Sequence, residues 1–389
     1  MLTLPFFEQA HRDLAEQLAA FARESIEPFA AAAEHDAPVA AGRAFIHRAA
    51  AAGLLPIFTG DGQTGPGVRA LCLAREAIAA CSGFADSVFA VHGLGTYPVV
   101  LAGSDGLKHR YLADAARGKA VAAFALTEPE AGSDPAGVQT AARRDGDEYV
   151  ISGTKTFISN AGLASFYVVF ARSGPGAGSK GLSAFVVDAG ASGFRVERQI
   201  ELLAPHAIGE LRFEECRVPA HNRLGAEGDG LKIALSTLDV FRSSVGAAAC
   251  GMAARALQES VTYAGRRRQF GSPLSEFQAT RMALADMATE LDAARLLVYR
   301  AAWTKDRGAA RVTRESSMAK LFATEAAQRI VDRAVQIHGG SGVTRGAAVE
   351  RLYREVRALR IYEGTSEIQR LVIAQQVITA PGEQPEHAS

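Results

Sequence analysis

The first part of the chain carries apolar side chains at the spacing of an amphipathic helix. Leu14, Leu18 and Phe21 lie four and three residues apart, and the same pattern returns over residues 70–80. Positions three and four apart share one face of a helix, so these side chains can be buried together. We therefore predict an all-helical N-terminal domain over residues 1–120.

The pattern changes to short apolar runs near residue 121. Residues 166–170 and 184–187 are rich in Val and aromatic side chains, and residues 211–214 alternate between apolar and charged. Clusters of Gly and Ser, as in residues 173–181, separate these runs. Short strands with turns between them are typical of a small barrel or sandwich, and we predict a β-barrel domain over residues 121–230.

One segment of this region predicts two strands joined by a turn. Residues 149–151 and 156–158 are apolar or β-branched at most positions. Ser152, Gly153 and Thr154 lie between them, and such residues favour turns. We therefore expect a strand, a turn and a second strand in this order.

Helical spacing returns in the last part of the chain, and the Gly339-Gly340 pair is expected to end one helix there. We predict a helical bundle over residues 231–380 and a flexible tail over 381–389. The order of helices, strands and helices differs from the alternation of a doubly wound parallel sheet. The helical spacing is carried by Leu284, Met287, Leu291, Ala294, Val298, Ile330, Ala334 and Ile337.

Composition narrows the classes of function. The 389 residues include 42 Lys and Arg against 42 Asp and Glu, and this zero net charge disfavours nucleic-acid partners. No run of about 18 apolar residues is evident, so we expect no membrane span, and the N-terminus lacks a signal-peptide pattern. The nine histidines are scattered without metal-ligand spacing and the cysteines form no C-x-x-C pair, so no metal site is predicted. We expect a cytoplasmic protein whose four cysteines are buried thiols: Cys72, Cys81, Cys216 and Cys250.

Three loop segments are candidates for chemistry. Residues 60–65 fit G-x-G-x-x-G, but they lack the preceding strand and following helix of a dinucleotide site, so we interpret them as a loop. Residues 125–134 are rich in hydroxyls and backbone donors, and they are either a ligand-binding turn or a plain domain crossing. In residues 360–370, Glu363 is either a solvated loop carboxylate or a base held in an apolar pocket, where its pKa would rise.

These segments together resemble the acyl-CoA dehydrogenase family. Residues 125–137 fit the first signature of that family, and residues 336–355 fit the second except at Gly346, a departure that affects a local contact. Tyr362-Glu363-Gly364-Thr365 completes the match, which covers nearly the whole chain. The resemblance implies an α+β multi-domain fold with an N-terminal helical domain, a middle β-barrel and a C-terminal four-helix bundle. It also implies FAD, a homotetramer made of two dimers, and an electron-transferring flavoprotein as acceptor.

The resemblance assigns cofactor-binding residues position by position. Ser159 takes the place of a Thr or Ser that bonds flavin N5, and Phe157 that of an aromatic side chain beside the ring. Arg267 and Phe270 take the places of residues that reach the FAD of a neighbouring subunit. The remaining FAD positions are Leu126, Thr127, Gly132, Ser133, Gln278, Gln336, Gly339, Gly340, Thr365 and Glu367.

The resemblance also assigns the substrate residues and the catalytic base. Glu363 matches the base that removes the α proton of an acyl-CoA while a hydride leaves the β carbon for the flavin, which gives a trans-2-enoyl-CoA. Some members of the family place the base at the position of Phe241, which cannot accept a proton, so Glu363 is the base that we nominate. The expected substrate-binding residues are Ser133, Asp239, Arg242, Tyr362 and Gly364.

Departures from the family pattern keep the substrate open. Ala85 and Phe89 replace the Arg and Ser that hold a distal carboxylate in glutaryl-type members, so a dicarboxylic substrate is disfavoured. Asp86, in the same region, is expected to be a surface or helix-cap residue. Residues 201–209 lack the usual glycine-and-arginine loop, which leaves an unusual or carrier-protein-bound thioester as an alternative. A flavin acyl-CoA oxidase is a second alternative.

Overall fold

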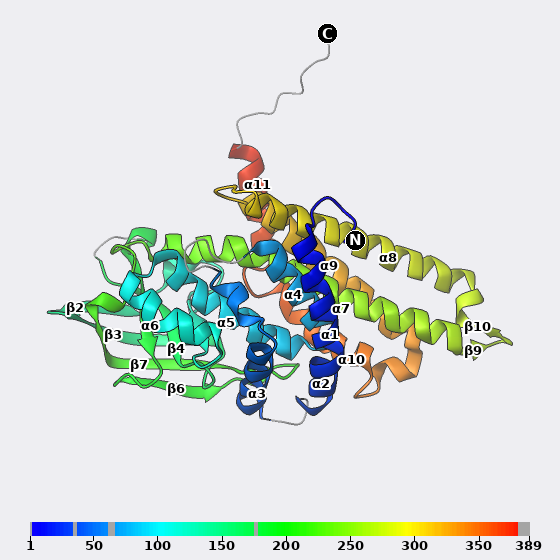
Figure 1. The fold of residues 1–389 in the computed structure, drawn as a ribbon, viewed down its shortest axis with the longest axis horizontal. Helices are drawn as coiled ribbons and strands as arrows, with labels where there is room; N and C mark the ends of the chain where they lie inside the picture. The colour runs from blue at the N-terminus through cyan, green and yellow to red at the C-terminus, as the bar shows by residue number, and fades with distance from the viewer. Residues whose placement is uncertain (1, 34–36, 61–66, 175–177, 380–389) are drawn as a thin grey trace, which may run out of the picture.

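The computed structural model describes residues 2–33, 37–60, 67–174 and 178–379. Helices occupy the N-terminal part as predicted, and they pack around one hydrophobic core with the C-terminal helices (Figure 1). They are α1 (Gln9–Phe21), η1 (Ala22–Ile26), α2 (Glu27–Ala33), α3 (Pro38–Ala51), η2 (Leu55–Phe58), α4 (Val68–Cys81), α5 (Gly83–Ala102) and α6 (Asp105–Ala116). The predicted loop over residues 60–65 lies almost entirely outside the described residues.

The middle of the chain forms an eight-stranded sheet in the order β6-β7-β3-β2-β4-β5-β8, with β1 parallel to β4. A single residue pair, Ala141 with Arg172, joins β2 to β4, so the sheet consists of two halves that enclose their own core. The strands are β1 (Ala122–Ala125), β2 (Ala141–Asp145), β3 (Glu148–Ser159), β4 (Phe166–Arg172), β5 (Leu182–Asp188), β6 (Phe194–Gln199), β7 (Ile208–Pro219) and β8 (Arg223–Leu224).

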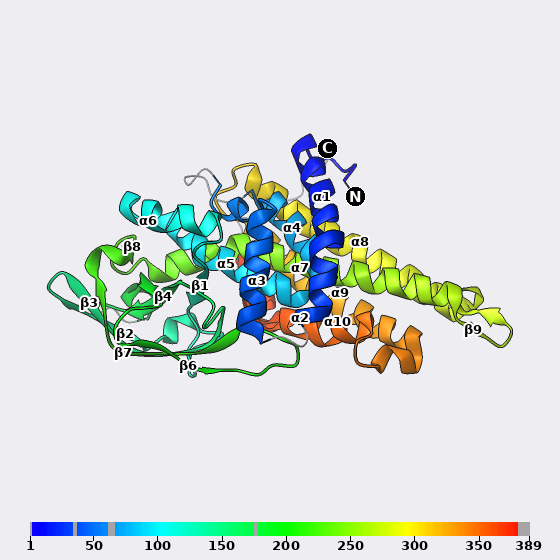
Figure 2. The ribbon, with the colours of Figure 1, turned by 60° about the horizontal axis from the view of Figure 1, so that its bottom comes forward.

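The continuous apolar runs of β4 and β5 have a clear cause. Tyr167 and Val169 face the core inside the sheet, whereas Phe166, Val168 and Phe170 belong to the core shared with the helices. Because both faces of β4 are covered, the strand shows no polar alternation. Figure 2 shows α5 lying against this part of the sheet, and the two elements are in contact.

The predicted turn at residues 152–154 is wrong. β3 runs without a break from Glu148 to Ser159, and its pairing with β7 shifts register between Ile151 and Gly153. Gly153 has φ of 152°, and a Cβ there would meet the Thr140 hydroxyl at 2.5 Å. The glycine therefore marks a bulge and a close approach inside one long strand, which a strand pattern interrupted by Gly also permits.

The C-terminal part is helical as predicted. α9 ends at His338, directly before Gly339, whose φ is 57°. In both views α7 and α8 extend side by side away from the sheet, with β9 at their far tip (Figures 1 and 2). The elements are α7 (Gly230–Arg266), β9 (Arg268–Gln269), β10 (Ser272–Pro273), α8 (Gln278–Asp306), α9 (Thr313–His338), α10 (Ala348–Val356), η8 (Arg357–Arg360) and α11 (Ser366–Thr379). The predicted tail lies outside the described residues.

Among the described residues, one helix has the length and composition of a membrane span, although no such run is expected from the sequence. α5 has 20 residues with a mean hydropathy of 1.2, and 83% of its apolar window is buried inside the protein. His92 of α5 accepts a hydrogen bond at Nδ1 from the Ala122 N–H and donates from Nε2 to Ala115 O. The packing and the polar contacts are those of a core helix.

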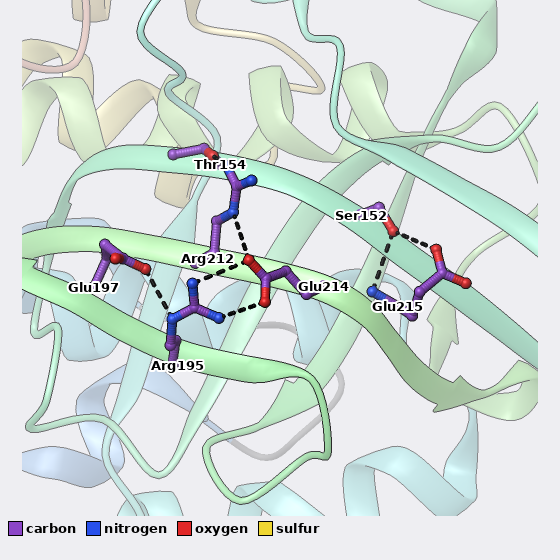
Figure 3. Close-up of polar contacts among 7 residues, drawn as sticks. All are labelled: Ser152, Thr154, Arg195, Glu197, Arg212, Glu214 and Glu215. Atoms are coloured by element: carbon purple, nitrogen blue, oxygen red, sulfur yellow. Dashed lines mark hydrogen bonds and ion pairs between the residues drawn. The ribbon is translucent and has the colours of Figure 1, made fainter.

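The outer face of β3, β6 and β7 carries an exposed polar network (Figure 3). Arg195 binds Glu197 at 2.8 Å and Glu214 at 2.8 Å, and Arg212 donates to Thr154 at 2.6 Å. Exposed ion pairs of this kind contribute about 0–1 kcal/mol each. The network therefore marks a solvated face of the sheet.

Candidate active site

Glu363 lies in a short loop between η8 and α11, in a backbone conformation that side chains rarely adopt. Its φ is 52°, and that of Gly364 is 91°. Lys320 of α9 donates to Gly364 O at 2.7 Å, and Gln369 of α11 donates to the carbonyls of Glu363 and Gly364 at 3.0 Å each. The loop is thus held from two helices, as expected where strain persists at a functional site.

The Glu363 carboxyl is buried and incompletely bonded. Burial raises its pKa, and the cations Arg75, Lys320 and Arg242 oppose this effect. Its Oε2 has no hydrogen-bond partner among the described residues. A carboxylate with an unused oxygen, a raised pKa and nearby cations can act as a general base near neutral pH.

The predicted pair of Asp239 and Arg242 lies on α7 beside this carboxyl. Arg242 Nη1 binds Asp239 Oδ1 at 3.3 Å, and Thr313 of α9 donates to Asp239 Oδ2 at 2.7 Å. Arg242 Nε is buried without a partner among the described residues. The structure therefore brings five of the predicted site residues together: Asp239, Arg242, Tyr362, Glu363 and Gly364.

The prediction that Asp86 is a surface or helix-cap residue is wrong. Asp86 is 1% exposed and accepts two hydrogen bonds from Arg75 of α4, at 2.9 and 2.8 Å. Arg75 is also 1% exposed, and its Nη1 donates to Ser244 of α7 at 2.9 Å. No sequence motif includes Arg75, although an arginine within the apolar run of a core helix is a signal for a buried partner.

The predicted cofactor segment around Thr127 is ordered by a second buried ion pair. Lys155 of β3 donates to Glu128 at 2.8 Å and to Leu126 O at 3.0 Å. Glu128 also accepts hydrogen bonds from the Gln139 and Thr140 N–H groups, at 2.7 and 2.9 Å. The Thr156 N–H donates to Thr127 O at 3.0 Å, so the segment lies beside the end of β3 that carries Phe157 and Ser159.

The surface of this region suits a flat polar ring. Phe157 has φ of 53° and is 57% exposed, which is unusual for an aromatic side chain on a strand. A Cβ at Gly132 would meet no atom within 4 Å, so the turn borders open space. The hydroxyls of Thr127 and Ser159 and the exposed ring of Phe157 together fit an isoalloxazine, which both stacks and hydrogen-bonds.

The segment over residues 201–209, which departs from the family pattern, also contacts the predicted flavin region through His206. His206 and Ser159 share a hydrogen bond of 2.8 Å between Nε2 and Oγ. Burial lowers the pKa of His206 to about 4, so the imidazole is neutral at physiological pH. The loop therefore contacts a predicted cofactor residue through a neutral side chain.

Other predicted cofactor residues form a separate group. Arg267 lies directly after the end of α7, 25 residues beyond Arg242. A helix of that length spans about 37 Å, which separates the two arginines. A surface depression of about 530 Å³ includes Arg267 and His338 in its lining, and Gln336 lies in the last turn of α9, two residues before the helix ends at His338. Phe270 and Gln278 lie at the hairpin tip and at the start of α8. Within one chain these residues do not meet the Glu363 site.

Thr365 and Glu367 lie at the start of the last helix, where the sequence placed them. The Thr365 hydroxyl accepts a hydrogen bond from the Ile368 N–H at 3.3 Å, which makes Thr365 the cap of α11. Glu367 lies in the first turn of this helix. The cap fixes the entry of α11 directly after the Glu363 loop.

Comparison with known families gives one consistent result. The chain matches three family models: the N-terminal domain of acyl-CoA dehydrogenase over residues 8–119, the middle domain over 123–216 and the C-terminal domain over 228–378. A 3-(aryl)acrylate reductase from Clostridium sporogenes is 39% identical over 96% of this chain and 100% of its own length. An acryloyl-CoA reductase (NADH) from Anaerotignum propionicum is 44% identical over 75% of both chains.

Solved structures agree in fold along nearly the whole chain. Butyryl-CoA dehydrogenase from Megasphaera elsdenii has a TM-score of 0.89 at 32% identity, covering 96% of this chain and 99% of its own. A glutaryl-CoA dehydrogenase from Mycobacterium smegmatis in complex with FADH2 has a TM-score of 0.87 at 30% identity, covering 96% and 95%. A chain in the structure described as the electron transferring flavoprotein of Acidaminococcus fermentans has a TM-score of 0.90 at 36% identity, covering 96% and 99%.

Proposed function

The chain belongs to the acyl-CoA dehydrogenase family of FAD-dependent oxidoreductases, and we propose that it catalyses α,β-dehydrogenation of an acyl-CoA thioester with Glu363 as the base. The observation that carries the proposal is the Glu363 carboxyl. It is buried, it has an unused oxygen, and it lies among three cations at the position where the family motif predicts the base.

FAD, when bound, would supply the acceptor for the hydride that leaves the β carbon. Glu363 removes the proton from the α carbon, and the electron pair of that C–H bond forms the new double bond as the β C–H bond breaks. The proton ends on the carboxylate, and the product is the trans-2-enoyl thioester. Strained backbone around Glu363 fixes the direction of the carboxylate, which supplies orientation before the reaction begins.

Residues of this chain hold the remaining parts in place. We assign the flavin ring to the region of Thr127, Phe157 and Ser159, since this region offers an exposed aromatic ring and two hydroxyls beside an open turn. Arg242 is assigned to the CoA moiety because it keeps one buried N–H without a partner among the described residues. A guanidinium with a free donor suits carbonyl or phosphate oxygens of a substrate.

The reverse reaction is a second candidate. Two relatives are named as reductases, one of aryl acrylates and one of acryloyl-CoA with NADH. The same geometry serves this direction: reduced flavin would supply the hydride to the β carbon, and protonated Glu363 would deliver the proton to the α carbon. Burial raises the pKa of Glu363, which favours the protonated form that reduction needs.

We also propose a homotetramer and an electron-transferring flavoprotein as redox partner. Large apolar side chains are exposed on the hairpin and on α11: Phe270, Leu371 and Ile378 are 96%, 66% and 77% exposed. Exposed apolar side chains of this size are typical of subunit interfaces. The likeness to a chain from a structure of an electron transferring flavoprotein supports the second partner.

An anaerobic titration of the FAD-loaded protein with a panel of acyl-CoAs tests the proposal. We expect one class of saturated acyl-CoA to bleach the flavin's visible absorption band with a stoichiometry of one thioester per flavin. Oxygen uptake during turnover separates an oxidase from a dehydrogenase. A flavin that stays oxidised with every saturated acyl-CoA, but is reoxidised by an enoyl-CoA after chemical reduction, would assign the reductase direction instead.

A further inference from the structure

The buried pair of Arg75 and Asp86 joins three helices at the level of the active site. Arg75 of α4 holds Asp86 of α5 through two parallel hydrogen bonds and donates a third to Ser244 of α7. The Ser244 hydroxyl in turn donates to Phe241 O at 2.7 Å. Because both charged side chains are only 1% exposed, the guanidinium has one fixed position.

The charge of the same guanidinium acts on the loop that carries Glu363. Burial raises the pKa of both the Tyr362 hydroxyl and the Glu363 carboxyl, and the positive charge of Arg75 opposes this rise. Among the cations that lower the pKa of Glu363 against the effect of burial, Arg75 has the largest influence, ahead of Lys320 and Arg242. Asp86 acts in the opposite sense on the same carboxyl.

Stability alone gives little reason for such a pair. Desolvation of two charges about cancels their attraction, and apolar side chains of equal volume are often as stable or more so. α4 carries another partly buried pair one residue further on, between Glu76 and Arg295 of α8, at 2.7 Å. Arg75 and Asp86 are among the largest influences on the pKa of Glu363, whereas Glu76 and Arg295 are not, so of these two pairs on α4 it is the Arg75 pair that acts on the reaction site.

Resting on the proposed function, we propose that Arg75, held in the buried cluster with Asp86 and Ser244, is a positioning residue that stabilises the negative charge of the Glu363 carboxylate. Asp86 and Ser244 hold the guanidinium in place, and Asp86 also offsets part of its charge. The strength of the base is therefore set by an ion pair on α4 and α5, outside the loop that carries the base.

The titratable and charged groups that influence Glu363 come from four helices and from its own loop. They are Arg75 on α4, Asp86 on α5, Arg242 on α7, Lys320 on α9 and Tyr362 in its own loop. Since the carboxylate is the active form in dehydrogenation, activity rises with pH through the pKa of Glu363. Removal of a cation moves this rise to higher pH, and removal of an anion moves it to lower pH.

Two variants with opposite expected effects test the proposal. We measure the pH dependence of the flavin bleaching rate at saturating acyl-CoA, using the best substrate from the titration. Arg75→Met should shift the rise upward by about one pH unit or more, and Asp86→Asn should shift it downward. The amide of Asn still accepts a hydrogen bond from Arg75, so this variant keeps most of the packing. Arg75→Lys, which keeps the charge without the fork, should recover part of the upward shift.

Arg295→Met is the matched control, because it also removes an arginine paired with α4 but should leave the pH profile unchanged. Loss of packing would move Arg75→Met and Asp86→Asn in the same direction, and that result overturns the proposal. An unchanged profile in Asp86→Asn overturns it as well, even if Arg75→Met fails to fold. If no acyl-CoA bleaches the wild-type flavin, the proposed function fails first, so the two failures are distinguishable.

Discussion

Replacement of Glu363 with glutamine is expected to leave FAD bound and to slow flavin bleaching by acyl-CoA at least about 1,000-fold. Glutamine has the same shape, and the loop contacts from Lys320 and Gln369 go to backbone carbonyls, so the loop should keep its conformation. The amide cannot take up the α proton at neutral pH. Stopped-flow absorbance under anaerobic conditions measures the rate.

Glu197→Gln is a suitable control for this variant, since Glu197 lies in the exposed network on the outer face of the sheet. Its bleaching rate should equal that of the wild type. If Glu363→Gln bleached fully at a near-normal rate, Glu363 would have no role as the base, and another carboxylate would have to be sought.

Replacement of Lys155 is expected to cause the largest loss of folding free energy among the substitutions considered for this protein. Lys155→Met leaves the Glu128 carboxyl buried without its cation, and breaking a buried pair in this way costs about 3–5 kcal/mol. The variant also loses the bond to Leu126 O that orders the predicted flavin segment, so FAD content should fall. Urea unfolding gives the free energy, and the ratio of visible to protein absorbance gives the FAD content.

The exposed pair of Arg195 and Glu214 is the control for the buried one. Both pairs have a contact of 2.8 Å, but Arg195 and Glu214 are about half exposed. Arg195→Met should therefore cost less than about 1 kcal/mol and leave FAD content unchanged. Equal effects of the two substitutions would show that Lys155 does not order the segment.

Local sequence patterns predict the order of elements well, since helical spacing and Val-rich runs report directly on burial. They fail where one residue type permits two structures. Gly153 suits a turn and a bulge equally, and its contact with Thr140 decides the outcome. α5 was missed as a long apolar helix because Gly, Thr and His interrupt its apolar residues, although most of it is buried.

Only those site residues that belong to a sequence motif can be predicted from the sequence. The motif around Glu363 places the carboxylate, and the structure adds how it is held and charged. Arg75 and Asp86 are 11 residues apart on two different helices. Their pairing depends on the chain turning between α4 and α5 at Ser82, the cap of α5. No periodicity in the sequence specifies this contact, and the same holds for Lys320 with Gly364.

Product analysis of a single anaerobic turnover is the sharpest test of whether this protein dehydrogenates an acyl-CoA at the α and β carbons. FAD-loaded protein is mixed with an equal amount of the best saturated acyl-CoA, quenched after bleaching, and the thioester is identified by mass spectrometry and chromatography. We expect a trans-2-enoyl-CoA that has lost one proton and one hydride relative to the added acyl-CoA, in an amount equal to that of the bleached flavin. A bleached flavin with an unchanged thioester, or with a double bond elsewhere in the chain, would contradict it.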